Sequence, residues 1–174
     1  MNKSLVIFDS AYGNTEKVAR AIAAALGPKT RVEILRASEV NLDMLAGVDL
    51  LVIGSPTQGF RPTKFVADVL KRLHSRGLKG VEVAAFDTRF EAAKLNSPML
   101  QLLIRTGGYA APRIAASLKK AGATLVAPPE GFFVEDTQGP LKSGELERAS
   151  AWARSLPHSS QIQPGIAQDQ ERRD

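Results

Sequence analysis

Short, almost continuous apolar runs alternate along the chain with longer segments in which apolar residues recur at helical spacing. The first run, Lys-Ser-Leu-Val-Ile-Phe-Asp at 3–9, is typical of a strand that is buried on both faces of a parallel sheet. The next segment ends at Gly27 and Pro28, which interrupt helices. Within it, the apolar residues share one face of an amphipathic helix; they are Val18, Ala19, Ile22, Ala23 and Leu26.

The same alternation continues to residue 156. This order of elements predicts an α/β fold, with helices on both faces of a doubly wound, five-stranded parallel sheet of order 2-1-3-4-5. Ligands bind such sheets at the carboxyl ends of strands 1 and 3, where the winding reverses. The further elements that we expect are strands at 31–36, 48–54, 81–87 and 123–127, helices near 62–76, 109–121 and 143–156, and a short helical turn near 40–46.

Two of the predicted helices carry an apolar stripe that we assign to the core. In helix 62–76, which has Pro62 at its first position, the stripe consists of Phe65, Val66, Val69, Leu70 and Leu73. In the last helix it consists of Leu146, Ala149, Trp152, Ala153 and Leu156.

Two regions depart from the alternation. Residues 91–107 form an insertion in which Ser97 as N-cap, Pro98 and a final Gly107 indicate a short helix. We predict that this insertion is a flap over the site or a contact in a homodimer, against the alternative of surface packing. Residues 157–174 are polar and without periodicity, so we expect one domain over 1–156 and a disordered C-terminal tail over 157–174.

The composition of the chain argues against several kinds of active site and against a membrane span. The chain has 174 residues, 44% of them hydrophobic, which suffices for one buried core. The sequence has no cysteine, which excludes a thiol nucleophile and a disulfide framework, and its two distant histidines argue against a zinc site. No apolar run approaches the roughly 20 residues that cross a bilayer, and the first run is too short for a signal-peptide core. We therefore expect a cytoplasmic protein without a membrane span.

The formal net charge of +5 raises the question of a nucleic-acid partner. No recognition motif or ladder of aromatic residues accompanies the basic residues, so we expect none. Two interpretations of the charge remain open, namely solvated helix faces and a docking surface for an acidic partner. The basic residues concerned are Lys64, Lys71, Arg72 and Arg76 in one predicted helix and Lys119 and Lys120 in another.

The junction at 7–15, Ile-Phe-Asp-Ser-Ala-Tyr-Gly-Asn-Thr, joins the first strand to the first helix and is a natural anion site. The hydroxyls of Ser10 and Thr15 flank a turn containing Gly13, and the first N–H groups of the helix face that turn. No Lys or Arg lies between Asp9 and Glu16, which favours a phosphomonoester held by dipoles and hydroxyls over a nucleoside triphosphate.

Two further loops follow strands at the same edge. The second loop, 54–62, is polar at Ser55, Thr57 and Gln58 and has the turn formers Pro56 and Gly59, of which the glycine allows close approach to a flat ring. Its Phe60 stacks on a ligand or packs against the next helix. The third loop, 86–90, contains Asp87, Thr88, Arg89 and Phe90. There Arg89 either provides a cation to a ligand or forms a surface ion pair with Asp87.

Together these three loops resemble those of the flavodoxin family. Phe-Asp-Thr-Arg at 86–89, Gly-Tyr-Ala-Ala at 108–111, Gly-Pro-Leu at 139–141 and Gly144-Glu145 are moreover similar to a bacterial subgroup of that family. The resemblance spans roughly residues 3–156 and implies a flavodoxin-like fold that binds flavin mononucleotide (FMN).

The resemblance also assigns roles to individual residues. It implies that the phosphate is held by side-chain oxygens and backbone N–H groups of Ser10, Tyr12, Gly13, Asn14 and Thr15. The family usually has a Thr or Ser where Ala11 and Tyr12 stand in this sequence. It further implies that the Gly59 carbonyl accepts the N5–H of the half-reduced ring, that backbone N–H groups of the third loop bind the pyrimidine oxygens, and that Arg89 favours negative charge at N1 and O2.

We predict an electron carrier that passes one or two electrons between a redox partner protein and another protein or small-molecule acceptor. The alternatives are a quinone or nitro-compound reductase that uses NAD(P)H, and a regulatory module of the same fold without flavin. A receiver domain is excluded because the third predicted strand ends in Gly54 rather than an aspartate, and a small phosphatase because the chain has no nucleophilic cysteine.

Removal of residues 159–174 is expected to leave both the melting temperature and the flavin content unchanged, because a tail without apolar periodicity contributes no core. Calorimetry and the flavin absorbance of the purified truncated protein measure the two quantities. A large loss of either would show that the tail is bound to the domain.

Overall fold

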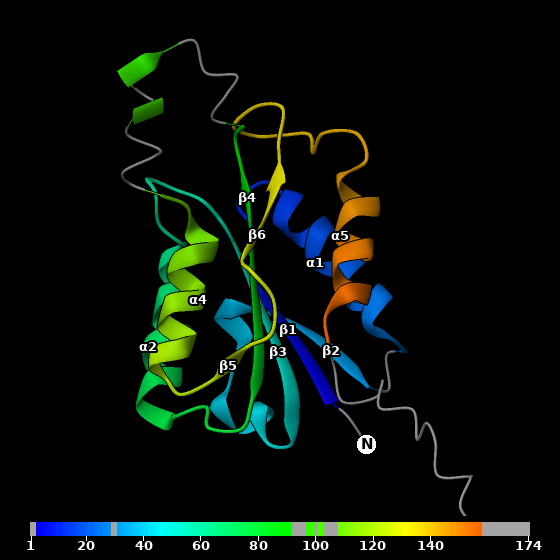
Figure 1. The fold of residues 1–174 in the computed structure, drawn as a ribbon, viewed down its shortest axis with the longest axis vertical. Coiled ribbons are helices and arrows are strands. Elements are labelled where there is room, and N and C mark those ends of the chain that lie inside the picture. Colours follow the sequence, from blue (N-terminus) through cyan, green and yellow to red (C-terminus); the bar gives the residue numbers. More distant parts are fainter. Residues whose placement is uncertain (1–2, 29–30, 92–96, 100, 103–107, 158–174) are drawn as a thin grey trace, which may run out of the picture.

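A twisted parallel sheet lies between two pairs of helices in the computed structural model of the protein (Figure 1). The structure describes residues 3–28, 31–91, 97–99, 101–102 and 108–157. The sheet has the strand order β2-β1-β3-β4-β5, with β6 also paired to β4, and this order confirms the predicted doubly wound fold. The strands are β1 (Lys3–Phe8), β2 (Val32–Arg36), β3 (Val48–Pro56), β4 (Glu82–Arg89), β5 (Thr124–Leu125) and β6 (Glu130–Phe133).

Two helices cover each face of the sheet, as Figure 1 shows. They are α1 (Asn14–Leu26) and α5 (Glu145–Ser155) on one face and α2 (Lys64–Arg76) and α4 (Ala110–Lys120) on the other. Side chains of β1 alternate between the two faces, so Leu5 and Ile7 pack toward α2 and α4 while Val6 and Phe8 pack toward α1 and α5. This explains the continuous apolar run. Two 3-10 helices, η1 (Ala37–Glu39) and η2 (Leu42–Leu45), occupy the predicted helical turn.

The last position in the sheet differs from the prediction. Instead of one strand at 123–127, two short strands lie end to end along β4, with β5 beside Glu82 and Val83 and β6 beside residues 86–89. Pro128 and Pro129 separate them, because a proline has no N–H to donate to a ladder. The prediction missed β6, a strand of four residues that contains a glycine.

Two apolar residues that we assigned to the core are exposed. Phe65 is 54% exposed and Leu146 is 38% exposed, and both lie one position outside the buried stripe of their helix. The buried side of α2 begins at Val66. In α5 the inward position is taken by Glu145, whose carboxylate accepts hydrogen bonds from the Phe133 N–H at 2.6 Å and from Arg148.

The insertion at 91–107 lies mostly outside the described residues. Its described part is helical at 98–99 and 101–102, and the Gln101 N–H donates to the Ser97 carbonyl at 3.0 Å, as the predicted short helix requires. Met99 and Leu102 are exposed. The predicted flap or dimer contact and the predicted tail beyond Pro157 fall outside the described residues and stay predictions.

An aromatic cluster lies under α5, next to a glycine of the central strand β3. Phe86 contacts Phe132 and Trp152 edge to face, with ring centroids 6.1 and 6.4 Å apart. The Phe86 ring also occupies the space that a side chain on Gly54 would need. A side chain at position 54 is therefore incompatible with the observed position of this ring.

Gly54→Ala is expected to lower the free energy of unfolding by about 1–3 kcal/mol, because the added methyl group overpacks the site against Phe86. Combining it with Phe86→Leu should cost less than the sum of the two single losses, since leucine leaves room for the methyl group. Urea denaturation of all three variants measures this coupling. Strictly additive losses would contradict the assigned contact.

Candidate functional site

The first, second and third loops meet at the carboxyl edge of the sheet, as predicted. They enclose a cavity of about 140 Å³ together with a segment that follows β6. Its lining consists of Ala11, Tyr12, Asn14 and Thr15 from the first loop, Pro56, Thr57 and Gln58 from the second, Thr88, Arg89 and Phe90 from the third, and Val134 and Thr137. The cavity therefore brings together ten of the sixteen residues that the sequence singled out, along with two that it missed.

The first loop presents an uncapped helix end and a buried hydroxyl. Gly13 is the N-cap of α1 with φ 84°, a left-handed conformation that favours glycine, and no side chain caps the helix. The Ser10 Oγ is buried and has no hydrogen-bond partner among the described residues. Leaving a buried hydroxyl unpaired costs about 1–3 kcal/mol. Ser10 does not itself line the cavity, whereas the N–H groups of the helix end, at Asn14 and Thr15, suit an anion there.

Thr88 joins the three loops. Its Oγ1 shares a hydrogen bond of 2.8 Å with Thr15 Oγ1 in the first loop, and its carbonyl accepts the Thr57 N–H of the second loop at 2.9 Å. The threonine pair is buried. A shift of any one loop would therefore break a hydrogen bond to another.

Residues 134–141 form a hairpin loop that sequence reasoning did not assign to the site. Its ends are joined by a bridge between Val134 and Leu141, and the Gln138 carbonyl accepts a hydrogen bond from Asn14 Nδ2 at 3.0 Å. Gly139 has no side chain and so leaves room for the Asn14 amide. The Gly-Pro pair at 139–140 was the available signal, but an ordinary turn has the same residues.

A cation also approaches the first loop, which has none of its own. Arg36 donates to the Ser10 carbonyl at 3.4 Å and pairs with Glu16 of α1 at 2.7 Å. Hydrogen bonds from Arg20 and Arg36 lower the pKa of Glu16, and the bond from Arg20 has the larger effect. Burial acts in the opposite direction. Sequence reasoning missed Arg36, although β2 must pair with β1 and the register places it beside Phe8.

The second loop forms a tight hairpin between Gln58 and Arg61, whose N–H groups and carbonyls bond each other. Gly59 and Phe60 at its tip have φ 52° and 65°. A left-handed phenylalanine is strained. Ser55 lies at the other end of the loop, where its Oγ accepts the Thr63 N–H at 2.9 Å and donates to the Pro56 carbonyl. The Ser55 hydroxyl thus positions the start of α2 in this structure.

The third loop contains the ion pair that we weighed as the alternative role of Arg89, but the pair is buried rather than at the surface. The side chains of Asp87 and Arg89 are 0% and 14% exposed, and two guanidinium nitrogens contact the two carboxylate oxygens, one of them at 2.8 Å. The guanidinium lies 3.7 Å from the centroid of the Tyr109 ring and occupies the space beside Gly131, which has no side chain.

Asp87 also holds the start of α4. Its Oδ2 accepts the Ala111 N–H at 2.7 Å, while the Thr57 Oγ1 accepts the Ala110 N–H at 3.0 Å. Burial raises the pKa of the Asp87 carboxyl, and the Arg89 guanidinium opposes this rise. Asp87, Arg89, Tyr109 and Ala111 of the sequence motifs thus belong to one largely buried network.

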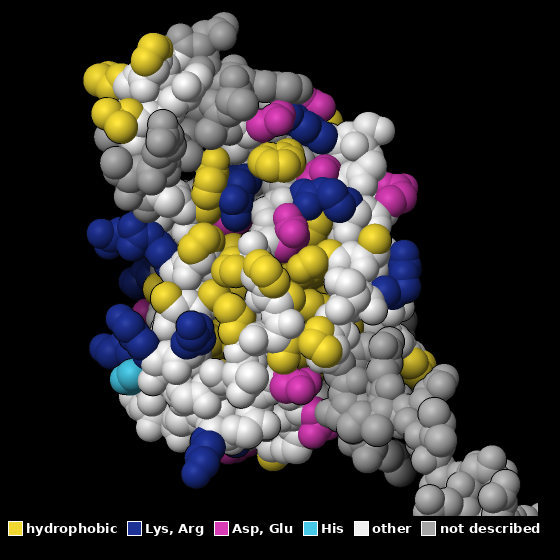
Figure 2. Space-filling view, viewed as in Figure 1, with side chains coloured by type: hydrophobic (Ala, Val, Ile, Leu, Met, Phe, Trp, Pro, Cys, Tyr) yellow, Lys and Arg dark blue, Asp and Glu magenta, His cyan; other side chains and the backbone are white. Residues whose placement is uncertain are grey.

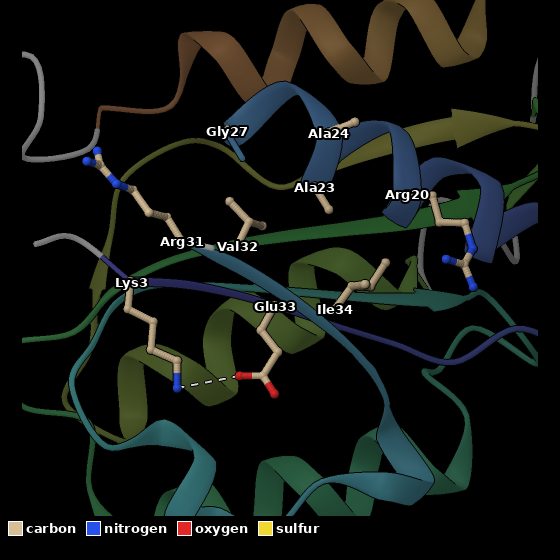
Figure 3. Close-up of a pocket in the computed structure, with 9 residues that line it drawn as sticks. All are labelled: Lys3, Arg20, Ala23, Ala24, Gly27, Arg31, Val32, Glu33 and Ile34. Carbon is tan, nitrogen blue, oxygen red and sulfur yellow. Dashed lines mark ion pairs between the residues drawn. The ribbon is translucent and has the colours of Figure 1, made fainter. Parts of the chain in front are cut away.

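A second cavity lies elsewhere, between α1 and β2 near the amino ends of the strands (Figure 3). Ala23, Ala24, Val32 and Ile34 contribute apolar walls, and the Lys3–Glu33 ion pair of 3.5 Å lies at its margin. None of the predicted site residues lines it.

Two kinds of feature are absent from the described part of the chain. It contains no group of three His, Asp or Glu side chains placed to hold a metal ion. It also contains no helix with the length and apolar character needed to span a membrane.

The sequence model of the flavodoxin family matches residues 6–145, which include all three loops and the hairpin loop. The chain belongs to the flavodoxin family. A flavodoxin from Picosynechococcus sp. is 42% identical over 57 residues, which make up 33% of this chain and 34% of that protein. The match therefore spans about a third of the curated relative's length.

Solved structures confirm the flavodoxin fold. A flavodoxin from the domain Archaea superposes with a TM-score of 0.70 at 20% identity, covering 88% of this chain and 95% of that one. An oxidised flavodoxin from Bacillus cereus has a TM-score of 0.66 at 20% identity, with coverages of 87% and 95%. The rubredoxin oxygen:oxidoreductase of Desulfovibrio gigas has a TM-score of 0.68 at 18% identity, and the match covers 90% of this chain but 35% of that one.

Membership of the family confirms the predicted resemblance and the predicted cofactor, because flavodoxins bind FMN. The predicted roles of the individual site residues stay predictions.

Asp87→Asn is expected to lower the free energy of unfolding of the flavin-free protein by about 3–5 kcal/mol, because it leaves the buried Arg89 without its counter-charge. Glu16→Gln is the matched control, since it breaks two more accessible ion pairs, to Arg20 and Arg36, and each should contribute less than about 1 kcal/mol. Guanidinium chloride denaturation measures both. Equal losses would show that the Asp87–Arg89 pair is not critical for stability.

Proposed function

We propose that this flavodoxin is an electron carrier whose FMN phosphate is bound in the first loop. The observation that carries the proposal is the buried Ser10 Oγ, which has no partner among the described residues and lies in the loop that leads into the uncapped end of α1. A phosphate oxygen would give that hydroxyl the acceptor it lacks, and the helix end would supply further N–H donors.

The residues present fit a phosphate monoester. Ser10, Thr15 and the N–H groups of the first turn of α1 would hold it, and the hydroxyl of Thr15 is already oriented by Thr88. Arg36 adds a cation behind the loop, but Glu16 largely neutralises it. Dipoles and hydroxyls would therefore contribute most of the binding free energy.

The second and third loops would hold the isoalloxazine ring. When bound, the flavin supplies the redox chemistry, since it accepts and donates one or two electrons. The hairpin tip at Gly59 and Phe60 would present backbone to the ring, and residues 88–90 would present theirs from the end of β4. A cavity of about 140 Å³ is smaller than enclosed ligand pockets, which measure roughly 300–1,000 Å³. We therefore expect much of the ring to stay open to solvent and to a partner.

The buried ion pair changes what we expect of Arg89. Because Asp87 binds its guanidinium, the two residues together present little net charge to the ring. We propose that they hold the third loop in place, while the carrier exchanges electrons with a redox partner protein in the cytoplasm.

Ser10→Ala tests the phosphate assignment. It should weaken FMN binding by about 1–3 kcal/mol, roughly 5- to 150-fold, because a charge-assisted hydrogen bond is lost. The flavin-free protein should be at least as stable as the original, because the variant loses no described hydrogen bond and no longer buries an unpaired hydroxyl. Titration of flavin-free protein with FMN, followed by quenching of flavin fluorescence, gives the affinity.

Thr63→Val is the matched control, because Thr63 Oγ1 is also buried without a described partner but belongs to the N-cap of α2. This variant should bind FMN like the original protein. Riboflavin, which has no phosphate, should bind both variants with equal affinity. Unchanged FMN affinity in Ser10→Ala would refute the phosphate site, and rapid anaerobic bleaching of the flavin by NADPH alone would favour a reductase over a carrier.

A further inference from the structure

The fold gathers basic residues that are scattered in the sequence onto one face of the molecule. Helices α2 and α4 lie side by side on the same face of the sheet (Figure 1). Seven exposed cations project from them and form what we call the basic face: Lys64, Lys71, Arg72, Arg76, Arg113, Lys119 and Lys120. Figure 2 shows dark blue side chains along this side of the molecule.

The two helices of this face themselves carry little negative charge. Within α2 and α4 the only acidic residue is Asp68, which is exposed on α2. The opposite helices have a mixed charge instead, since Glu16, Glu145 and Glu147 accompany Lys17, Arg20, Arg148 and Arg154. The net positive charge is therefore concentrated on one side and gives that side a positive potential.

Part of the basic face is held in place. Arg72 donates to the Val40 carbonyl at 2.9 Å and Arg76 donates to the Leu42 carbonyl at 2.8 Å, so both guanidinium groups are anchored between α2 and the η2 region. Together with Lys71, Asp68 and Leu42 they line a shallow hollow. Anchored side chains lose less conformational entropy when a partner binds than mobile ones do.

An aromatic residue extends this face toward the candidate site. Phe65 follows Lys64 in the first turn of α2 and is 54% exposed. The start of α2 lies directly after the second loop, which lines the cavity. Exposed aromatic side chains surrounded by charged residues are typical of the central contacts in protein interfaces.

We propose that the basic face, with Phe65 at its end, is the docking surface for an acidic protein. This proposal rests on the proposed function, because it specifies the chemistry of the redox partner. An aromatic side chain and an apolar floor at Leu42 are complementary to a protein surface. The phosphate backbone of a nucleic acid offers no apolar side chains to Phe65 and Leu42, so a protein is the better match to this surface.

The test uses the full-length flavin-free protein and fluorescein-labelled polyglutamate as an acidic polypeptide probe, with binding followed by fluorescence anisotropy. A triple variant with Lys64→Glu, Lys71→Glu and Lys119→Glu removes charge from the basic face. The matched control has Lys17→Glu, Arg31→Glu and Arg154→Glu, which change the net charge equally outside α2 and α4. None of these six side chains takes part in an ion pair or a side-chain hydrogen bond among the described residues.

We expect the first variant to bind polyglutamate at least about tenfold more weakly and the control to retain most of the affinity, because the interaction depends on local potential rather than on net charge. Amide NMR shifts on adding the probe should fall on α2 and α4. Phe65→Ala should weaken binding of an acidic peptide that contains leucine and leave polyglutamate binding unchanged.

Equal losses in both triple variants would overturn the proposal, and so would tighter binding of duplex DNA or of phosphatidylserine vesicles than of polyglutamate at the same salt concentration. FMN titration of the same variants keeps the two proposals separate. The variant of the basic face should bind FMN normally if it is folded, so a failure of FMN binding in the original protein would contradict the carrier function and leave the docking result unaffected.

Discussion

The candidate site depends on one buried carboxylate. Asp87 binds Arg89 through two contacts and accepts the Ala111 N–H, so a single residue of β4 positions the third loop and the first turn of α4. Arg89 in turn packs between the Tyr109 ring and Gly131 of β6. Burying such a pair costs desolvation free energy, which is recovered only when the hydrogen bonds around it are complete. The neighbouring Thr88 connects the third loop to the first and second loops through hydrogen bonds.

Two arginines near the predicted flavin site are each paired with a carboxylate. Arg36 is paired with Glu16 behind the first loop, and Arg89 is paired with Asp87 behind the third. An anion bound in the first loop would therefore interact mainly with backbone N–H groups and hydroxyls. Such donors fix both the position and the orientation of a phosphate, because each hydrogen bond is directional. Phe60 at the second loop is the strained element of this arrangement.

The net positive charge lies instead on α2 and α4, away from these neutral pairs. The net charge and the paired charges thus lie on different parts of the molecule. Under the two proposals, the paired site would bind the flavin without a strong bias from fixed charge, whereas the basic face would speed the encounter with acidic proteins and orient them. Because α2 begins directly after the second loop, a partner seated on its first turn would lie next to the cavity. Docking and electron exchange are then linked by the position of one helix.

The sequence by itself determined the sheet, its order and the three loops at its edge, because buried parallel strands require continuous apolar runs and their carboxyl ends share one edge. It also indicated Ser10, Gly13 and Thr15 as parts of an anion site, since a turn and the helix start that follows it involve residues close in the chain. Only the tertiary structure decided that Arg36 and Gln138 approach the first loop, that Asp87 and Arg89 are buried together, and that β6 completes the sheet. The exposure of Phe65 and the basic face were also decided there. These features depend on which side chains of distant segments contact each other. The periodicity of a single helix or strand does not indicate such contacts.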